Sequence, residues 1–401
     1  MKSGWKCNTI EELCEFSSGL WKGDVPPFLN VGVIRNTNFS KDGKLDFSDV
    51  AYLDVEAKKF EKRRLVYGDI ILEKSGGGPK QPVGRVALFD KEEGDFSFSN
   101  FTSSIRVRCP DELNYRFLHK FLYWIYTTGV TEGMQSHSTG IRNLDNNAYK
   151  AIQVRYPAPP EQHRIVSILD EAFEGIATAT ANAEKNLSNA RELFDSTLQS
   201  IFSNNSEEWV KQTFSEVCEI TSALVDPKET KYLDMLHVGG ANIESKTGRT
   251  VGLKTARDEG LISGKFVFDE SMVLYSKIRP YLMKVARPEF QGLCSADIYP
   301  LSSKIGKLDR NFLFYLLLTP LFTEYANAGS ARAGMPKVNR EHLFAYTFLL
   351  PSIKTQIQCA AKLDEVSAEV SELEYIYQQK LSALAELKKS ILHQAFSGQL
   401  N

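Results

Sequence analysis

Two long stretches of the chain place apolar residues at spacings of three and four throughout. The first runs from Ile165 to Ile201 and the second from Cys359 to Ala395. An apolar stripe of this period along one face predicts an amphipathic helix. The pattern therefore predicts two helices, each much longer than an ordinary globular helix.

Both predicted helices have start signals. Pro159 and Pro160 stand before the first turn of one helix, and Ser352 follows Pro351 as a candidate N-cap of the other. Roughly 40 residues at a rise of ~1.5 Å make each helix ~60 Å long. A helix of this length has too little core of its own, so its apolar stripe needs a partner.

The obvious partner for each stripe is the other stripe. We expect the two helices to pack antiparallel as a coiled coil. Its expected interface is formed by Leu169, Ile176, Leu187, Phe194, Leu363, Val370, Leu381 and Leu384. The alternative is that each helix packs only on its own globular domain.

The two helical segments are copies of one another. Residues 156–162 (YPAPPEQ) return as residues 350–356 (LPSIKTQ), and Leu-Asp-Glu at 169–171 returns at 363–365. The register then holds without a gap to Phe202 and Phe396. A looser echo precedes each copy, at residues 9–15 and 213–219. Repetition at this period indicates duplication of a unit made of one domain and one helix.

The segments before each helix have the pattern of mixed α+β domains. Short β-branched and aromatic runs bounded by Gly, Pro, Asn and Asp predict strands at residues 28–34, 69–72, 84–89 and 104–108. A helix is predicted at 115–126, and the second half repeats this order with strands at 271–275 and 283–286 and a helix at 311–318. We therefore expect α+β domains at 1–155 and 204–350, and spacer helices at 156–203 and 351–401.

Composition narrows the possibilities further. The 401 residues are 42% hydrophobic and 24% charged, which is ordinary globular usage. The chain shows neither a charged-then-apolar leader nor an apolar run of membrane-spanning length, so we expect a cytoplasmic protein without membrane contact. The six cysteines form no C-x-x-C pair, which argues against zinc and disulfides.

The net charge of −2 bears on nucleic-acid binding. A protein that binds DNA through phosphates alone should be basic. Either DNA is not the ligand, or partner proteins supply much of the positive charge.

The first domain has one conspicuous candidate contact loop, at residues 74–85 (KSGGGPKQPVGR). Glycines allow close approach of a backbone to a ligand, and Lys, Gln and Arg side chains are donors suited to phosphates and base edges. The candidate contacts in this loop are Lys74, Ser75, Gly77, Lys80, Gln81 and Arg85. The alternative interpretation is a flexible hairpin, and the spacing excludes a P-loop.

Three further stretches are candidate contact surfaces. The corresponding stretch of the second domain mixes cations with aromatic rings at Tyr275, Lys277, Arg279, Tyr281 and Lys284. Just before each long helix come two loops aligned at Gly140 and Gly334, with the candidates Thr139, Arg142 and Asn143 and their counterparts Arg332, Lys337 and Asn339. The shared glycine fits a structural bend as well as a loop that faces DNA.

No sequence motif predicts catalysis by this chain. Val25-Pro26-Pro27-Phe28 resembles an amino-methyltransferase motif, but valine replaces the polar residue that would bind the target amine. No Gly-rich loop after a strand offers a site for S-adenosylmethionine, and no His or Cys cluster offers metal-assisted hydrolysis. We expect no catalysis, no cofactor and no metal in this chain alone.

With the pattern Pro-Ala-Pro-Pro-Glu-Gln-x-x-Ile-x-x-x-Leu-Asp-Glu of residues 157–171 in place, the chain resembles the specificity subunits of type I restriction-modification enzymes, over essentially all 401 residues. The second copy departs from the pattern, with Ser-Ile-Lys-Thr-Gln in place of Ala-Pro-Pro-Glu-Gln. The resemblance implies two target recognition domains, each reading half of a bipartite double-stranded DNA site, held at a fixed distance by the helices. It also implies two modification subunits that bring S-adenosylmethionine and methylate adenine, and restriction subunits that use ATP and Mg.

Two other functions remain open at this point. The chain could be a scaffold whose domains bind other proteins and never touch DNA. It could also be the recognition subunit of a methyltransferase-nuclease of another type. Loops rich in Lys, Arg, Asn and Gln mildly favour DNA.

Overall fold

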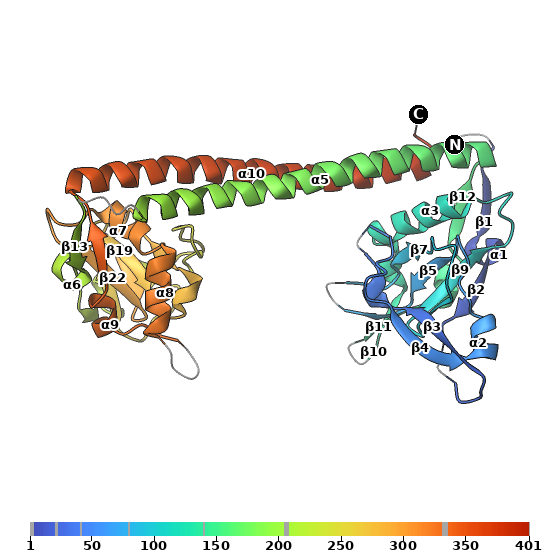
Figure 1. The fold of residues 1–401 in the computed structure, drawn as a ribbon, viewed down its shortest axis with the longest axis horizontal. Helices are drawn as coiled ribbons and strands as arrows, with labels where there is room; N and C mark the ends of the chain where they lie inside the picture. The colour runs from blue at the N-terminus through green and yellow to red at the C-terminus, as the bar shows by residue number, and fades with distance from the viewer. Residues whose placement is uncertain are drawn as a thin grey trace. The chain divides into compact units, whose positions relative to one another are not determined.

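A computed structural model describes residues 4–20, 23–40, 42–78, 81–138, 141–203, 208–330 and 336–400. The chain divides into two compact units (Figure 1). Unit 1 comprises Met1–Glu184 and Gln379–Asn401, and unit 2 comprises Lys185–Gln378. Each unit therefore contains one globular body and parts of both long helices.

The two predicted helices are α5 (Pro159–Phe202) and α10 (Ile353–Ser397). At the start of α10, the Ser352 hydroxyl accepts a hydrogen bond from the Thr355 backbone N–H at 3.3 Å, as expected of an N-cap.

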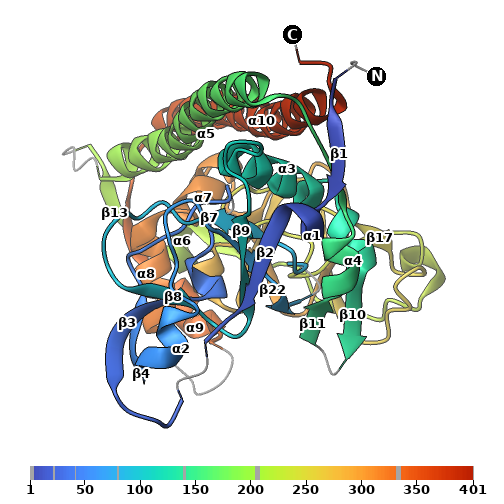
Figure 2. The ribbon, with the colours of Figure 1, turned by 90° about the vertical axis from the view of Figure 1, so that its right-hand side faces the viewer.

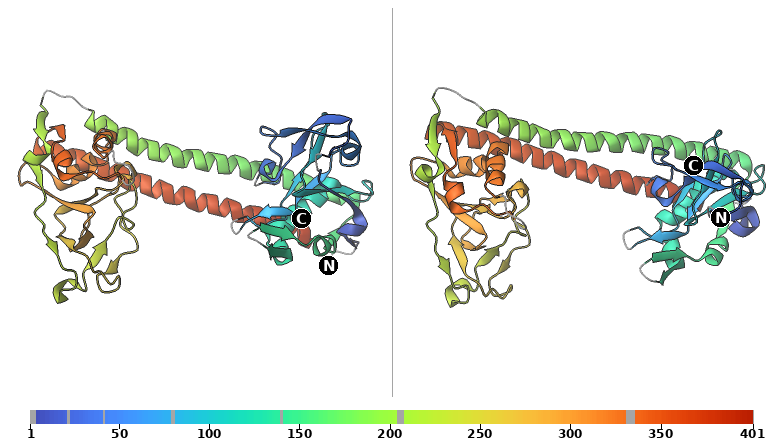
Figure 3. Two further views of the ribbon diagram at one scale, coloured as in Figure 1. Left: turned by 90° about the horizontal axis from the view of Figure 1, so that it is seen from below. Right: turned by 60° about the horizontal axis from the view of Figure 1, so that its bottom comes forward.

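The two helices run antiparallel within each unit (Figures 1 and 3). In unit 1, Arg164 near the start of α5 donates to the Leu400 carbonyl at 3.3 Å, and Phe173 further along lies 4.8 Å from the Lys388 ammonium. In unit 2, Arg191 pairs with Glu374 at 2.6 Å. Residues later in α5 therefore contact residues earlier in α10. This order confirms the expected antiparallel pairing.

The helix ends also complete the core of each unit. In unit 1, Leu169 of α5 and Phe396 of α10 pack in one cluster with Phe117 of α3 (Tyr115–Thr127), the helix that lies under the pair in Figure 2. In unit 2, Leu198 and Leu363 pack with Phe312 of α7 (Arg310–Leu316). The helices thus pack on each other and on the bodies, so the two packing alternatives are combined.

Most residues of the expected coiled-coil interface are shielded from solvent. Leu169, Ile176, Leu187, Leu363 and Val370 are buried, and Phe194, Leu381 and Leu384 are half-buried.

The body of unit 1 contains a four-stranded antiparallel sheet in the order β2 (Cys14–Ser18), β9 (Thr102–Val107), β5 (Ile70–Glu73) and β7 (Val86–Leu88). A second sheet has the order β4 (Ala51–Glu56), β3 (Phe28–Ile34), β8 (Phe96–Phe98). Strand β1 (Lys6–Thr9) pairs with β12 (Gln153–Tyr156), and α1 (Ile10–Leu13), α2 (Ala57–Glu61) and α4 (Asn146–Lys150) complete the body.

Unit 2 has a four-stranded sheet in the order β14 (Cys218–Glu219), β22 (Ile298–Ser303), β19 (Met272–Ser276), β20 (Val285–Ala286). A five-stranded sheet has the order β15 (Leu224–Val225), β18 (Lys265–Phe268), β21 (Gly292–Ser295), β16 (Leu236–Val238), β17 (Lys254–Thr255). Strand β13 (Val210–Thr213) pairs with β23 (Thr347–Leu350), and the helices are α6 (Phe214–Val217), α7, α8 (Pro320–Ala328) and α9 (Arg340–Phe344). The expected fold class, two α+β bodies joined by a long antiparallel helix pair, is confirmed.

The repeated sequence elements make the same contacts in both units. The looser sequence repeat near the start of each body is a capping box. In the pairs Thr9 with Glu12 and Thr213 with Glu216, each side chain accepts a hydrogen bond from the other residue's backbone N–H. This explains why Thr and Glu recur there while their neighbours vary.

The repeated glutamine clamps each long helix to its body. In unit 1 the buried Gln162 accepts from the Asn114 N–H at 2.8 Å and donates to the carbonyls of Glu112 and Pro157. In unit 2 Gln356 accepts from the Asp309 N–H at 2.7 Å and donates to the carbonyls of Lys307 and Pro351. A buried amide must find such partners, so this position tolerates little change.

Candidate nucleic-acid interface

The structure brings together the two candidate contact stretches of unit 1. Strands β10 (Gln135–Ser138), β11 (Ile141–Leu144) and β6 (Ser75–Gly77) form one sheet in that order. Arg142 lies opposite Gly77 and Asn143 opposite Ser75, whose hydroxyl donates to the Asn143 side chain at 2.5 Å. Segments more than 60 residues apart in sequence thus form one surface, on which Lys74, Ser75, Arg142 and Asn143 are partly exposed and Gln81 is exposed.

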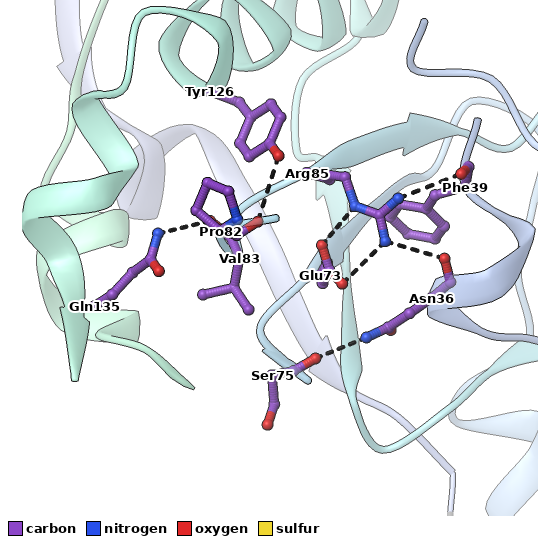
Figure 4. A network of polar contacts seen from close by, with 9 residues as sticks. All are labelled: Asn36, Phe39, Glu73, Ser75, Pro82, Val83, Arg85, Tyr126 and Gln135. Atoms are coloured by element: carbon purple, nitrogen blue, oxygen red, sulfur yellow. Dashed lines mark hydrogen bonds and ion pairs between the residues drawn. The ribbon is translucent and has the colours of Figure 1, made fainter. Parts of the chain in front are cut away.

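Arg85 has a different environment from that expected of a contact residue (Figure 4). Its guanidinium binds the Glu73 carboxylate through two hydrogen bonds, of 2.7 and 3.0 Å, and the Glu73 side chain is only 1% exposed. The remaining donors reach the carbonyls of Asn36 and Phe39, and the guanidinium lies over the Phe39 ring. Arg85 is therefore engaged inside unit 1, and we assign it to loop structure rather than to DNA.

The loop is held along both sides. Asn36 donates to the Ser75 carbonyl at 2.7 Å, Gln135 donates to the Val83 carbonyl at 3.1 Å, and Tyr126 donates to the Pro82 carbonyl at 3.4 Å (Figure 4). Gly77 is buried, and a Cβ there would lie 2.7 Å from the Gln81 carbonyl oxygen. The described part of the loop is a hairpin that hydrogen bonds hold on both sides.

Lys74 differs from its neighbours because its charge is not compensated. Burial lowers the pKa of the Lys74 ammonium. Within the described ranges this ammonium has no ion pair and no hydrogen bond. A partly desolvated cation without a counter-ion gains most from an incoming anion or base acceptor.

Unit 2 also brings its two candidate stretches together. Ile278 pairs with Lys337 in an isolated bridge, and the Arg279 N–H donates to the Pro336 carbonyl at 2.9 Å. Arg279, Lys337 and Tyr281 are exposed, Tyr281 by 53%. All three side chains are accessible to a ligand, although the Lys337 ammonium also pairs with Asp297.

Other candidate contact residues of unit 2 interact with groups of the unit itself. The Lys277 and Lys337 ammonium groups share the Asp297 carboxylate, at 3.6 and 3.1 Å. Burial, and then the neighbouring Lys337 charge, lower the pKa of Lys277, against the opposing effect of Asp297. Lys284 donates to the Gly240 carbonyl and Asn339 caps α9. Tyr275, only 2% exposed, packs edge-on against Phe322 and is a core residue rather than a surface contact.

The sites of the two units are equivalent in the backbone. The Leu144 N–H donates to the Lys74 carbonyl at 2.8 Å, and the Val338 N–H donates to the Lys277 carbonyl at 2.9 Å. The residue that follows, Asp145 or Asn339, caps the next short helix in each case. The same frame therefore carries different side chains in the two units.

Three candidates, Lys80, Thr139 and Arg332, lie outside the described residues. Four residues that hold these surfaces in place were not among the predicted candidates: Asn36, Glu73, Gln135 and Asp297. Glu73 offered a signal, because a carboxylate directly after the apolar run Ile70–Leu72 must find a cation when the strand is buried.

Unit 2 contains a hollow of about 900 Å³ between its part of the helix pair and its body. Five cationic side chains line it together with small residues of α10: Arg191, Lys246, Arg249, Arg287 and Arg310, with Ser367, Ala368 and Ser371. Four carboxylates, Asp195, Glu289, Asp364 and Glu374, also line it, so the hollow is polar and nearly neutral.

The part of the chain that the structure describes has no group of three or more His, Cys, Asp or Glu side chains placed to hold a metal ion. None of its helices combines the length and the apolar character that a membrane span requires.

This chain is similar in sequence to known proteins. The family model described as "Type I restriction modification DNA specificity domain" matches residues 2–187 and again 206–382. A type I restriction enzyme EcoDI specificity subunit of Escherichia coli is 27% identical over an alignment of 343 residues, and the match covers 77% of this chain and 76% of that protein. A putative type I specificity subunit of Haemophilus influenzae is 29% identical over an alignment of 192 residues, and the match covers 43% of this chain and 46% of that protein.

Two solved structures share the fold. One, from a study of complex assembly and conformational transition of the type I R-M system, has a TM-score of 0.78 at 18% identity and covers 100% of this chain and 99% of its own. The other, the HsdS subunit from Thermoanaerobacter tengcongensis, has a TM-score of 0.59 at 18% identity and covers 100% and 98%. The family match spans both repeats, and this chain therefore belongs to the family of type I restriction modification DNA specificity domains.

Proposed function

We propose that this specificity subunit reads a bipartite double-stranded DNA site, with residues 1–155 reading one half and residues 204–350 the other. The observation that carries the proposal is the equivalent frame of the two contact surfaces, in which Lys74 and Lys277 accept the same backbone hydrogen bond. Two domains with the same backbone arrangement but different side chains can read different base sequences.

The proposed contacts are the accessible groups of each frame. In the first domain they are Lys74, Ser75, Gln81, Arg142 and Asn143, joined by Lys80 and Thr139 from the remainder of the loops. In the second they are Arg279, Tyr281 and Lys337, joined by Arg332. The cations suit phosphates and guanine, and the amides suit adenine.

We propose that the chain is non-catalytic and works with two modification subunits and with restriction subunits. Those partners would supply S-adenosylmethionine, ATP and Mg. The net charge of −2 fits this division of labour, because partners that surround the DNA would neutralise most of its phosphates. The helix pair would set the distance between the two readers.

Exchange of one domain tests directly whether each domain reads one half of the DNA site. Replacing residues 1–155 with the same region of another family member is expected to change one half of the methylated motif and leave the other half and the gap unchanged. Long-read methylation mapping in cells that carry the complete system measures this. A changed second half would contradict modular reading, and a wild-type system without any motif would favour a scaffold that does not bind DNA.

We further propose that the unit 2 hollow receives a side chain of a modification subunit. Three residues after the repeated Asp170 and Asp364 stand Phe173 and Ser367. In unit 1 the Phe173 ring lies between the Lys120 and Lys388 ammonium groups, at 4.6 and 4.8 Å. In unit 2, Ser367 at the equivalent position lines the hollow. An aromatic side chain from a partner would find cations there as Phe173 does.

Filling the hollow from within tests this docking proposal. Ser367→Phe is expected to weaken binding of one of the two modification subunits by about tenfold, which is ~1.4 kcal/mol. Native mass spectrometry of the reconstituted complex measures the stoichiometry, and Ser382→Phe, the same change at an exposed position of α10, is the matched control. Equal binding by both variants would contradict the proposal.

A further inference from the structure

We propose that Asn36, Glu73 and Arg85 are positioning residues that determine the first half of the DNA target without touching DNA. The proposal rests on the proposed function, because it presumes that the loop at residues 74–85 reads bases. It concerns what holds that loop in the shape in which it reads.

The ion pair between Glu73 and Arg85 joins the two sides of the loop at its base. Both residues are shielded, with side-chain exposures of 1% and 14%. Their backbones are also paired, since the Glu73 N–H donates to the Arg85 carbonyl at 2.8 Å. A bidentate pair fixes direction as well as distance, so the path of the loop is set where it leaves the sheet.

Arg85 also ties the loop to a separate turn of the chain. Its Nη2 donates to the Asn36 carbonyl at 3.1 Å, while the Asn36 side chain donates to the Ser75 carbonyl at 2.7 Å. Asn36 therefore receives a hydrogen bond from one side of the loop and gives one to the other (Figure 4). The turn at residues 36–38 acts as a brace between them.

Gly76 shows how closely this brace approaches the loop. Its φ is +100°, and a Cβ there would lie 2.9 Å from the Asn36 amide nitrogen. The backbone next to Ser75 is thus pressed against Asn36. Because the Ser75 hydroxyl binds Asn143, movement of Asn36 would displace both proposed contacts together.

The described part of unit 2 has only part of this device: Lys284, which stands in the place of Arg85, donates to the Gly240 carbonyl but pairs with no carboxylate. The residue before Lys74 is Glu73, whereas the residue before the equivalent Lys277 is Ser276, whose hydroxyl makes only a 3.4 Å contact with the Ile278 carbonyl. Loss of the network should therefore affect one half-site, and the other half-site is a reference within the same molecule.

The test compares two ion pairs of unit 1 whose carboxylates are buried. Glu73→Gln and Asn36→Ala disturb the brace, while Asp69→Asn disturbs the pair of Asp69 with Arg106, which is also bidentate, at 2.7 and 2.7 Å, with an Asp69 side chain 1% exposed. Each variant is purified in complex with its modification subunits. Competition binding measures affinity for duplexes with the wild-type motif and with single-base changes in either half, and thermal unfolding measures stability.

For Glu73→Gln and Asn36→Ala, we expect discrimination in the first half to fall about tenfold or more, with the second half unchanged. For Asp69→Asn, we expect a similar fall in unfolding temperature and unchanged discrimination in both halves. Wild-type discrimination by both brace variants, or equal relaxation by Asp69→Asn, would overturn the positioning role and leave the proposed function standing. A wild-type complex without sequence preference would instead overturn the proposed function itself.

Discussion

Removing seven residues from each long helix is expected to shorten the gap between the two half-sites by about three base pairs. The deletion takes residues 183–189 from α5 and the equivalent residues 377–383 from α10. Seven residues span ~10 Å at ~1.5 Å per residue, and duplex DNA rises ~3.4 Å per base pair. Seven residues are also close to two turns, so the apolar stripe remains on the same face. Methylation mapping of the altered system measures the gap.

A matched control keeps the length of the helices and changes only their chemistry. Replacing the exposed Glu184 and Lys185 with Gln is expected to leave the gap unchanged. If the double deletion yields a stable complex that methylates with the wild-type gap, the helices do not set the spacing.

Phe396→Ala is expected to lower the free energy of unfolding of unit 1 by about 3–5 kcal/mol, as is usual for truncation of a buried aromatic ring. The Phe396 ring lies 5.4 Å from Phe117, 5.5 Å from Phe121 and 5.5 Å from Trp124. It is the point at which the end of α10 enters the core of unit 1. Truncation would leave a cavity among three rings, so this end of α10 should detach before the rest of the unit unfolds. Urea unfolding followed by hydrogen exchange of α10 measures both effects.

Leu387→Ala is the control for this experiment. Leu387 lies on the same helix within unit 1 but is 47% exposed, so its truncation should cost well below 1 kcal/mol. Equal destabilisation by the two variants would mean that Phe396 contributes no special packing between α10 and α3.

The long helices were predictable because their signal is local and repeated. Ile165, Leu169 and Ile176 share one face through spacing alone, and the helix follows for most surroundings that bury that face. The observed bounds, Pro159–Phe202 and Ile353–Ser397, lie close to the start signals at Pro159 and Ser352. The bounds predicted for the helix at residues 311–318 were less accurate. This helix ends at Leu316, and a separate helix begins at Pro320 after the capping residue Thr319.

The contact surfaces were only partly predictable. Residue types indicated which loops carry donors, and the structure brings those loops together in both units. The same reasoning placed Arg85 and Tyr275 among the contacts, whereas Arg85 is bound to Glu73 and Tyr275 lies in the core. A side chain's availability depends on what the fold places beside it, and sequence spacing carries no record of that.

Sequence by itself determined the tandem repeat, the two amphipathic helices, their start signals and the positions of the candidate loops. These depend on interactions among residues a few positions apart, so their pattern can be read along the chain. Tertiary structure alone decided that Lys74 has no counter-ion among the described residues, while Arg85 pairs with Glu73 and Lys277 shares Asp297 with Lys337. Their partners, such as the Asn36 carbonyl 49 residues from Arg85, come into reach only when the strands assemble. Ion pairing and burial act through space, and only the folded chain brings those groups within range of each other.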